Sequence, residues 1–326
     1  MLVAGLSSLT ACRQDTDDLS VAASRRLQMG ACMTRTDDTF ANATQLTFFM
    51  ANGSTAECQS FTYDAHEAVW NTGATVMENT SYKVFGYMPS QGAGTAAIQP
   101  LNGDYAYGAE MTVSGLPTMT ATDVCFVIAV KGGNEVTAVG DFVEWSYGYA
   151  VAEEDGDKKY INFLLDHLYA NLNLLFKVQE GYTQKRTIKL KKVELSALVS
   201  GQVDVSITQP EGTLPVVAFT PMGSGSVTYT LLDSPDGIEL STVTPMAANI
   251  FVAPGVSSLT LRCTYDIYNE AGHIIRRDCT TENVLTEERT SLEQGYRTDL
   301  SLTVNPTYFY VLSDEDAPEL ELSVDY

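Results

Sequence analysis

Positively charged side chains are scarce in this sequence of 326 residues, which has 19 lysines and arginines against 41 aspartates and glutamates. The formal net charge of −22 argues against nucleic-acid binding, because contacts with phosphate groups need clusters of Lys and Arg. The one short basic run, residues 186–192, is interpreted as the solvent-facing side of a strand. A strongly acidic surface mainly keeps an exported protein soluble.

Catalytic motifs are also lacking. The sequence has no nucleophile elbow, no zinc-protease helix, no phosphate-binding loop and no Cys-x-x-Cys pair. Its three histidines, His66, His167 and His273, are interpreted as ordinary sheet or turn residues, with His167 capping an interface between domains. Trp70 and Trp145 are interpreted as core aromatics, and the alternative is a surface that stacks a sugar. We therefore expect no enzymatic activity, no cofactor and no metal site.

No stretch of the chain approaches the roughly 18 apolar residues of a transmembrane helix. The first residues are apolar and small and end in Leu9-Thr10-Ala11-Cys12, which resembles the lipobox at which bacterial lipoproteins are lipidated. A polar tether, residues 13–18, follows. This segment is short for a signal peptide and has no Lys or Arg before Cys12, so we expect the true start to lie upstream. The alternative is an apolar N-terminus with an incidental cysteine.

Helical periodicity is nearly absent, whereas alternation with a period of two recurs between Gly, Pro, Asn and Asp residues. Residues 82–87, 124–130 and 142–149 are each expected to form strands. The pattern predicts an all-β protein of tandem β-sandwiches, and the length of the chain predicts two domains.

The expected division of the chain has three parts. Residues 1–18 are the signal segment and tether, residues 19–159 form the first sandwich, and residues 160–326 form the second. The acidic run 153–157 is interpreted as an exposed connection near the boundary. The alternative is a calcium-binding loop, although its spacing does not match an EF-hand.

The clearest strand is marked by six apolar residues at period two: Leu168, Ala170, Leu172, Leu174, Phe176 and Val178. A helix would scatter these residues around its circumference, whereas a strand places all six on one face. The opposite face is expected to carry Tyr169, Asn171, Asn173 and Lys177. Residues 188–195 are expected to form another strand, with a bulge at Lys191 and Lys192.

Residues 259–268 and 273–279 flank a turn and predict a β-hairpin. If the turn is centred on Ala271, Cys263 faces Cys279 at a separation that is compatible with a disulfide. An exported protein provides the oxidising setting for this bond. The alternative is two free thiols.

Short motifs along most of the chain resemble the fimbrillin superfamily, the major fimbrial subunits of type V pili. These motifs are residues 9–12, Thr34-Arg35, residues 46–50, 81–89 and 163–178, the segment 292–296 with residues 300–304, and residues 305–308 and 311–314. The resemblance implies two transthyretin-like β-sandwich domains. It also implies a lipidated precursor that reaches the outer-membrane surface.

The resemblance further implies assembly by strand exchange with other pilin subunits. A trypsin-like protease cuts after an arginine, the first strand leaves, and a C-terminal strand of the next subunit fills the groove. In this sequence Cys12 is the matching lipidation site and Arg35 the matching cleavage position, with Arg25 and Arg26 as alternatives. The leaving strand is residues 21–33. The donor tail, residues 308–326, contains Leu320, Leu322 and Val324.

Loss of an edge strand would expose unpaired backbone groups and an apolar groove, and a neighbour's strand would restore both pairing and burial. Cys32 lies on the leaving segment, so strand exchange requires its thiol to be free of any disulfide within the subunit. The prediction is therefore a structural pilin of the cell surface that supports adhesion. The alternative is a monomeric surface lipoprotein that binds a glycan or host ligand, which exposed tryptophans and a retained first strand would favour.

Overall fold

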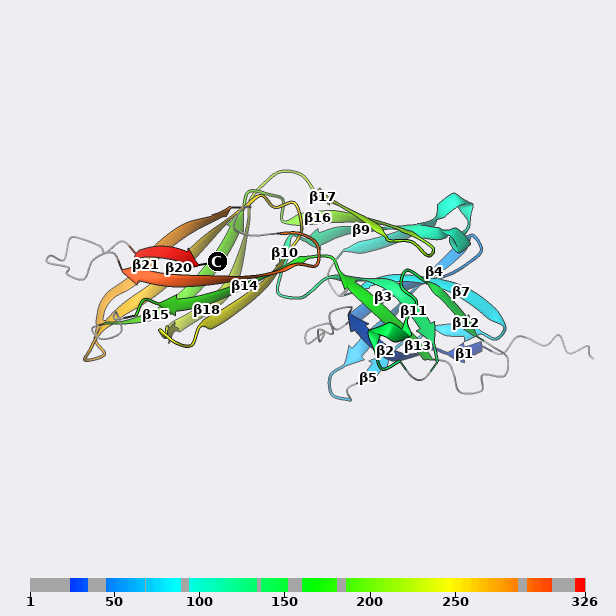
Figure 1. Ribbon diagram of the computed structural model, residues 1–326, viewed down its shortest axis with the longest axis horizontal. Coiled ribbons are helices and arrows are strands. Elements are labelled where there is room, and N and C mark those ends of the chain that lie inside the picture. The colour runs from blue at the N-terminus through cyan, green and yellow to red at the C-terminus, as the bar shows by residue number, and fades with distance from the viewer. Residues whose placement is uncertain are drawn as a thin grey trace, which may run out of the picture.

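The computed structural model describes residues 24–34, 45–67, 69–88, 94–133, 136–151, 160–180, 186–286, 292–306 and 320–325. Strands dominate these residues, which confirms the predicted all-β class. Three short 3-10 turns interrupt them: Leu101–Gly103, Tyr105–Tyr107 and Val139–Asp141. Among the residues described, no helix has the length and apolarity that crossing a membrane requires. The strands form two lobes along the long axis of the molecule (Figure 1).

The first lobe contains an eight-stranded sheet in the order β2-β13-β11-β7-β3-β4-β5, with β12 paired to β7. Its strands are β2 (Gln28–Thr34), β3 (Gln45–Asn52), β4 (Thr55–Asp64), β5 (Val69–Asn71), β7 (Thr80–Met88), β11 (Cys125–Gly132), β12 (Gly148–Val151) and β13 (Tyr160–His167). A four-stranded sheet packs on one face, formed by β8 (Thr95–Pro100), β9 (Gly108–Pro117), β16 (Gln202–Pro210) and β17 (Val216–Pro221). A small ladder adds β1 (Ser24–Arg26) and β6 (Thr75–Met77).

The eight-stranded sheet of the first lobe is buried on both faces. One face forms a core around the rings of Phe48, Phe61 and Phe163, and the other packs on the four-stranded sheet through residues such as Met111 and Val205. A strand that is covered on both sides has no solvent face to carry polar residues. This explains why residues 124–130 form a continuous apolar run instead of an alternating one.

The second lobe is a sandwich of two sheets around one core. One sheet is ordered β10-β19-β14-β22-β23 and comprises β10 (Met119–Thr120), β14 (Ala170–Val178), β19 (Met246–Val252), β22 (Arg297–Pro306) and β23 (Leu320–Asp325). The other is ordered β18-β15-β20-β21 and comprises β15 (Arg186–Ala197), β18 (Val227–Glu239), β20 (Ser258–Asn269) and β21 (Ile274–Thr286).

The two lobes share the chain in an interleaved order. We expected two consecutive domains that divide at residue 159, but β12 and β13 on either side of that point belong to the same sheet. After β14 and β15 have entered the second lobe, β16 and β17 return to the first and pair with β9. In the opposite direction, β10 leaves the first lobe and pairs with β19. Neither lobe is therefore one continuous stretch of chain.

The alternation predicted for residues 168–178 is confirmed from residue 170 onward, where the second core contains Ala170, Leu172, Leu174, Phe176 and Val178. Leu168 instead belongs to the core of the first lobe, because the chain leaves one lobe at His167 and enters the other at Ala170. Tyr169, which was predicted on the face opposite Leu168, belongs to the same core as Leu168. Its side chain is 1% exposed at the junction of the lobes, where its hydroxyl donates to the carbonyl of Pro117 at 2.7 Å.

Replacement of Tyr169 with phenylalanine tests this junction. Loss of the bond to Pro117 is expected to lower the free energy of unfolding by about 1–2 kcal/mol, since the ring is kept and only a buried hydrogen bond is lost. Chemical denaturation measures the change. Tyr107→Phe is the matched control, because Tyr107 is 59% exposed, and it should have no measurable effect. Equal stability of the two variants would contradict the role given to the hydroxyl.

The register of the predicted hairpin β20–β21 departs from expectation. Beside the turn, Tyr268 faces Ile274 as predicted, but two register shifts follow and place Cys263 opposite Thr281 and Cys279 opposite Tyr265. The predicted pairing of Cys263 with Cys279 is therefore wrong, and both thiols are free in the structure. Bulges caused the error, because each extra residue on one strand moves all later pairs.

Other local predictions had mixed outcomes. The bulge at Lys191 and Lys192 is confirmed, since β15 changes register between Leu190 and Lys192 against both of its neighbours. The strand expected over residues 142–149 is wrong for most of its length, because β12 covers only Gly148–Val151. The acidic run 153–157 lies outside the described residues.

Candidate functional site

The N-terminal segment, β1 together with β2, fills a slot between two strands of the first lobe. β2 is an edge strand of the eight-stranded sheet and runs parallel to β13, whereas β1 pairs antiparallel with β6. Leu27 links the two strands. Its side chain is buried in the core, and its amide donates to the carbonyl of Ala74 at 2.9 Å. Removal of this segment would therefore open two backbone edges and take a core side chain with it.

A buried asparagine holds β2 in this slot. The register between β2 and β13 shifts around Asn162, whose side chain has no solvent exposure. Its Oδ1 accepts from the amide of Ala31 at 2.6 Å, while its Nδ2 donates to the carbonyls of Lys131 at 3.0 Å and Gly133 at 2.8 Å. One side chain thus bridges the edge strand and the end of β11. We name this group the Asn162 latch.

Gly30 is fitted to the Asn162 latch. A Cβ atom at this position would lie 2.2 Å from Asn162 Oδ1, so any larger residue would displace the amide from Ala31. Sequence reasoning did not identify the latch, because its partners come from segments more than 25 residues away from Asn162. One signal was available: Asn162 is a polar residue inside the otherwise apolar run 161–165.

The residues predicted for processing lie at the start of the chain. Arg35 falls outside the described residues, directly after the last residue of β2, Thr34. Arg25 and Arg26 lie within β1, opposite Val76 and Thr75. Proteases cleave paired strands less readily than exposed chain, so the β1–β6 ladder protects the two alternative positions. The predicted lipidation site, Cys12, also lies outside the described residues.

The thiol of Cys32 lies on β2, opposite Phe163 of β13. It is free in the structure, as are the thiols of Cys58 and Cys125. Burial raises the pKa of Cys32 to about 12, so the group is an uncharged thiol at neutral pH. No disulfide in the described part of the chain therefore ties β2 to the rest of the first lobe.

The C-terminal strand β23 lies at the edge of the second lobe (Figure 1). It pairs antiparallel with β22, and the three predicted donor residues occupy alternate positions of this ladder. Leu320, Leu322 and Val324 stand opposite Pro306, Val304 and Leu302, respectively. The predicted donor strand is thus docked on its own chain in this structure.

A polar group on the same sheet joins β22, the strand that receives β23, to its other neighbour, β14. Asp299 of β22 accepts hydrogen bonds from Asn173 Nδ2 at 2.8 Å and from Arg297 Nε at 3.1 Å. These donors lower the pKa of the Asp299 carboxyl below its ordinary value, with the Asn173 amide as the largest cause. A lowered pKa in the folded state means that the carboxylate stabilises the fold above its unfolded pKa, and that this contribution disappears as the pH falls through the folded pKa.

Replacement of Asn173 with alanine is therefore expected to raise the pKa of Asp299 toward its ordinary value and to weaken the loss of stability at acidic pH. An NMR titration of the carboxyl groups measures the first effect. Asp141 is the internal control, because its lowered pKa comes from the backbone amides of Thr137 and Ala138. An unchanged pKa of Asp299 in the variant would show that the Asn173 amide is not the cause.

Two of the histidines and both tryptophans were interpreted from the sequence as structural residues. His66 and His273 lie exposed at turns. Trp70 is partly buried against Tyr63, and Trp145 packs on the second face of the first lobe. These positions agree with the interpretation of both tryptophans as core aromatics and leave no exposed indole platform among them.

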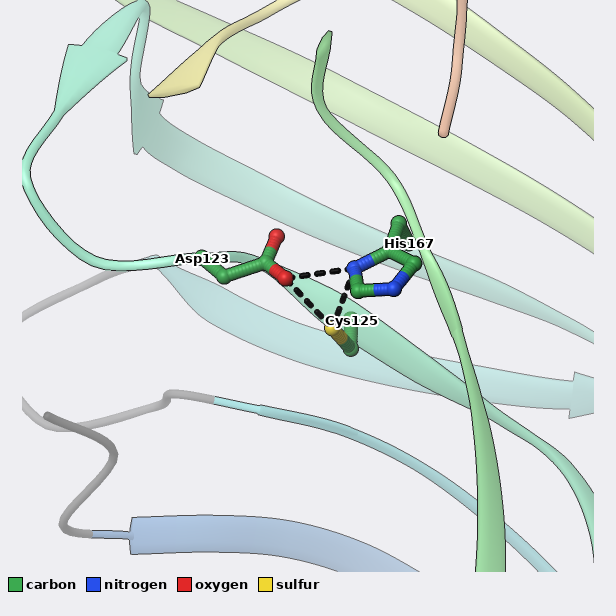
Figure 2. A group of neighbouring side chains, drawn as sticks. All are labelled: Asp123, Cys125 and His167. Carbon is green, nitrogen blue, oxygen red and sulfur yellow. Dashed lines mark hydrogen bonds and ion pairs between the residues drawn. The ribbon is translucent and has the colours of Figure 1, made fainter. Parts of the chain in front are cut away.

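His167 stands apart from the other histidines because it is buried beside Cys125 and Asp123 (Figure 2). Its predicted place at an interface is confirmed: it ends β13, and its carbonyl accepts from Gln294 Nε2 of the second lobe at 3.1 Å. Burial, followed by the nearby Asp123 carboxylate, raises the pKa of the Cys125 thiol well above its ordinary value. Sequence reasoning missed the cluster because its members lie up to 44 residues apart.

No family model and no curated protein sequence matches the chain. A fimbrial protein from Bacteroides vulgatus is similar in structure, with 11% identity, coverage of 91% of this chain and 99% of that chain, and a TM-score of 0.42. A "putative cell adhesion protein" from Bacteroides uniformis is similar with 12% identity, coverage of 91% of this chain and 96% of that chain, and a TM-score of 0.43.

Proposed function

We propose that this chain is a structural subunit of a cell-surface fimbria that polymerises by strand exchange. The observation that carries the proposal is the position of the first and last strands that the structure describes. The segment that fills a slot, β1 with β2, belongs to the first lobe, whereas the free-edged strand β23 belongs to the second lobe (Figure 1). A contact between the second lobe of one subunit and the first lobe of the next is heterologous, and such contacts repeat into open filaments.

The construction of the slot supports removal of its occupant. The segment is held by the parallel pairing of β2 with β13, the short β1–β6 ladder, the buried Leu27 and the Asn162 latch. Its Cys32 thiol forms no disulfide. Once the segment has left, β13 and β6 would present unpaired edges above an apolar core. Three aliphatic side chains from a neighbour's tail would contribute about 5–8 kcal/mol of gross burial, from which the ordering of the tail subtracts.

In this proposal the docked tail is a resting position. β23 pairs with β22 of its own chain before assembly, and it exchanges that edge for the vacated slot of a neighbour. The other parts of the proposal come from the sequence motifs. Cys12 carries the lipid anchor at the outer membrane, a trypsin-like protease cuts after Arg35, and the partners are other pilin subunits.

Limited trypsin digestion tests the proposal. Cleavage after Arg35, confirmed by N-terminal sequencing, is expected to release the first strand and to convert the monomer into a ladder of multimers that resist detergent. The uncut chain, kept at the same concentration, serves as the control and should remain monomeric. A cut chain that loses the segment and still runs as a monomer would overturn the proposal.

A further inference from the structure

We propose that Asp123, Cys125 and His167 form a binding site for a divalent cation of the zinc class at the junction of the two lobes. The three ligand atoms converge on one another (Figure 2). Cys125 Sγ lies 3.6 Å from His167 Nδ1 and 3.4 Å from Asp123 Oδ2, and the nitrogen and the carboxylate oxygen are 2.5 Å apart. This site is independent of the strand-exchange proposal and uses none of its residues.

The arrangement differs from a catalytic relay. In a Cys–His–Asp relay the two ring nitrogens serve different partners, one facing the nucleophile and the other the carboxylate. Here the same nitrogen, His167 Nδ1, faces both the thiol and the carboxylate. Convergence of three donors on one point is instead the geometry of a shell around a cation.

The distances can be compared with those of a tetrahedral zinc site. Zinc bonds are about 2.3 Å long to sulfur and about 2.0–2.1 Å long to nitrogen and oxygen. In a tetrahedral site the sulfur should therefore lie about 3.5 Å from the nitrogen and from the oxygen, and the nitrogen about 3.3 Å from the oxygen. The two sulfur distances, 3.6 Å and 3.4 Å, already fit. The Asp123–His167 contact at 2.5 Å would have to widen, which a small rotation of the aspartate side chain provides.

A second observation points to a missing partner. The other carboxylate oxygen, Asp123 Oδ1, is buried and makes no hydrogen bond with any described residue. A buried acceptor without a partner is costly, so natural structures rarely leave one. When Oδ2 binds the cation, a water molecule on the same cation can donate to Oδ1, whereas the hydrogen bond to His167 uses Oδ2 alone.

The donor set selects the class of metal. Sulfur, imidazole nitrogen and one carboxylate suit Zn²⁺ and its analogue Co²⁺, whereas Ca²⁺ and Mg²⁺ prefer oxygen ligands alone. As the metal–sulfur bond forms, the Cys125 thiol releases its proton to solvent. Three protein ligands leave a fourth position for a water molecule, as in open zinc sites.

The place of the site gives the cation a structural effect. Cys125 and His167 are direct partners across β11 and β13, and the next residue, Leu168, donates its amide to the carbonyl of Val124 at 2.7 Å. Gln294 of the second lobe donates a hydrogen bond to the carbonyl of His167. A bound metal would therefore fix the end of the first lobe from which the chain passes into the second.

Cobalt titration of the full chain, after chelation and dialysis, tests the site. We expect about one equivalent of Co²⁺ to give a thiolate-to-cobalt charge-transfer band, which Zn²⁺ then displaces, and calorimetry to give the matching zinc affinity. Cys125→Ser should abolish the band and weaken zinc binding at least about 100-fold. Cys263→Ser, which alters a buried thiol of the second lobe, and Cys58→Ser, which alters an exposed one, are the controls and should leave both readouts unchanged.

Folding of each variant is checked by circular dichroism. If Cys125→Ser does not fold, Asp123→Asn and His167→Gln take its place, and each should weaken zinc binding with the thiolate band reduced or lost. The proposal is overturned if the folded native chain gives no charge-transfer band. It is also overturned if the band follows Cys58 rather than Cys125, which would indicate an adventitious surface thiol.

Discussion

Replacement of Asn162 with alanine is expected to lower the free energy of unfolding by about 3 kcal/mol, because three partly buried backbone groups lose the side chain that bonds them. The amide of Ala31 and the carbonyls of Lys131 and Gly133 all bond this one side chain. The truncated side chain cannot replace these bonds, and water has little access to the space that it leaves, because Asn162 has no solvent exposure. Equilibrium unfolding in guanidinium chloride measures the loss.

The location of the loss distinguishes a latch from a general packing residue. Hydrogen exchange should accelerate most in β2, since the variant frees the edge strand before the rest of the sheet. Asn171→Ala is a matched control, because the Oδ1 atom of Asn171 has no hydrogen-bond partner among the described residues, and it should cost less than about 1 kcal/mol. Uniform acceleration across the first lobe would contradict the assignment of Asn162 to β2.

Deletion of the C-terminal tail is expected to abolish multimers completely while the monomer stays folded. A chain that ends at Ser313 lacks β23, which contributes only one outer ladder to the second lobe. The core residues beneath it, such as Leu302 and Val304, remain sandwiched between the two sheets. After cleavage at Arg35, the deletion variant would have a vacant slot and no strand to offer.

Gel electrophoresis of the cut deletion variant gives the result, with the cut full-length chain as the reference. The acidic tail, which includes Glu319, Glu321 and Asp325, also predicts that assembly slows in high salt if its receiving groove is rimmed with cations. A synthetic peptide of residues 314–326 should bind the cut variant and leave it monomeric. Multimers that persist without the tail would exclude it as the donor and require another strand.

The alternation of apolar and polar residues predicted many of the strands, because a strand with one buried face requires that alternation. The alternation of residues 170–178 follows from one face turned to a core, and the bulge at Lys191 follows from two polar residues that break the alternation. Errors began where the chain passes between the lobes, as at Tyr169, or where an extra residue shifts a ladder. The pairing of Cys263 failed for the second reason, although the turn itself was predicted correctly.

The functional groups were harder to predict, because each depends on contacts between distant segments. The Asn162 latch joins three strands, and the cluster around His167 joins the ends of two. Neither residue type is unusual by itself, so the one sign available was an isolated polar residue, Asn162, in an apolar run. The interleaved order of the two lobes along the chain could not be predicted either, since nothing in residues 202–221 indicates that they pair with β9.

The return of β16 and β17 to the first lobe has a consequence for how the protein is made. The second sheet of that lobe stays incomplete until residue 221 has been synthesised, although β8 and β9 were finished about one hundred residues earlier. The apolar face of β8 and β9 stays exposed to solvent during this interval. Newly made chains should therefore depend on a holding chaperone until translation has passed this point, and nascent fragments that stop before residue 202 should aggregate.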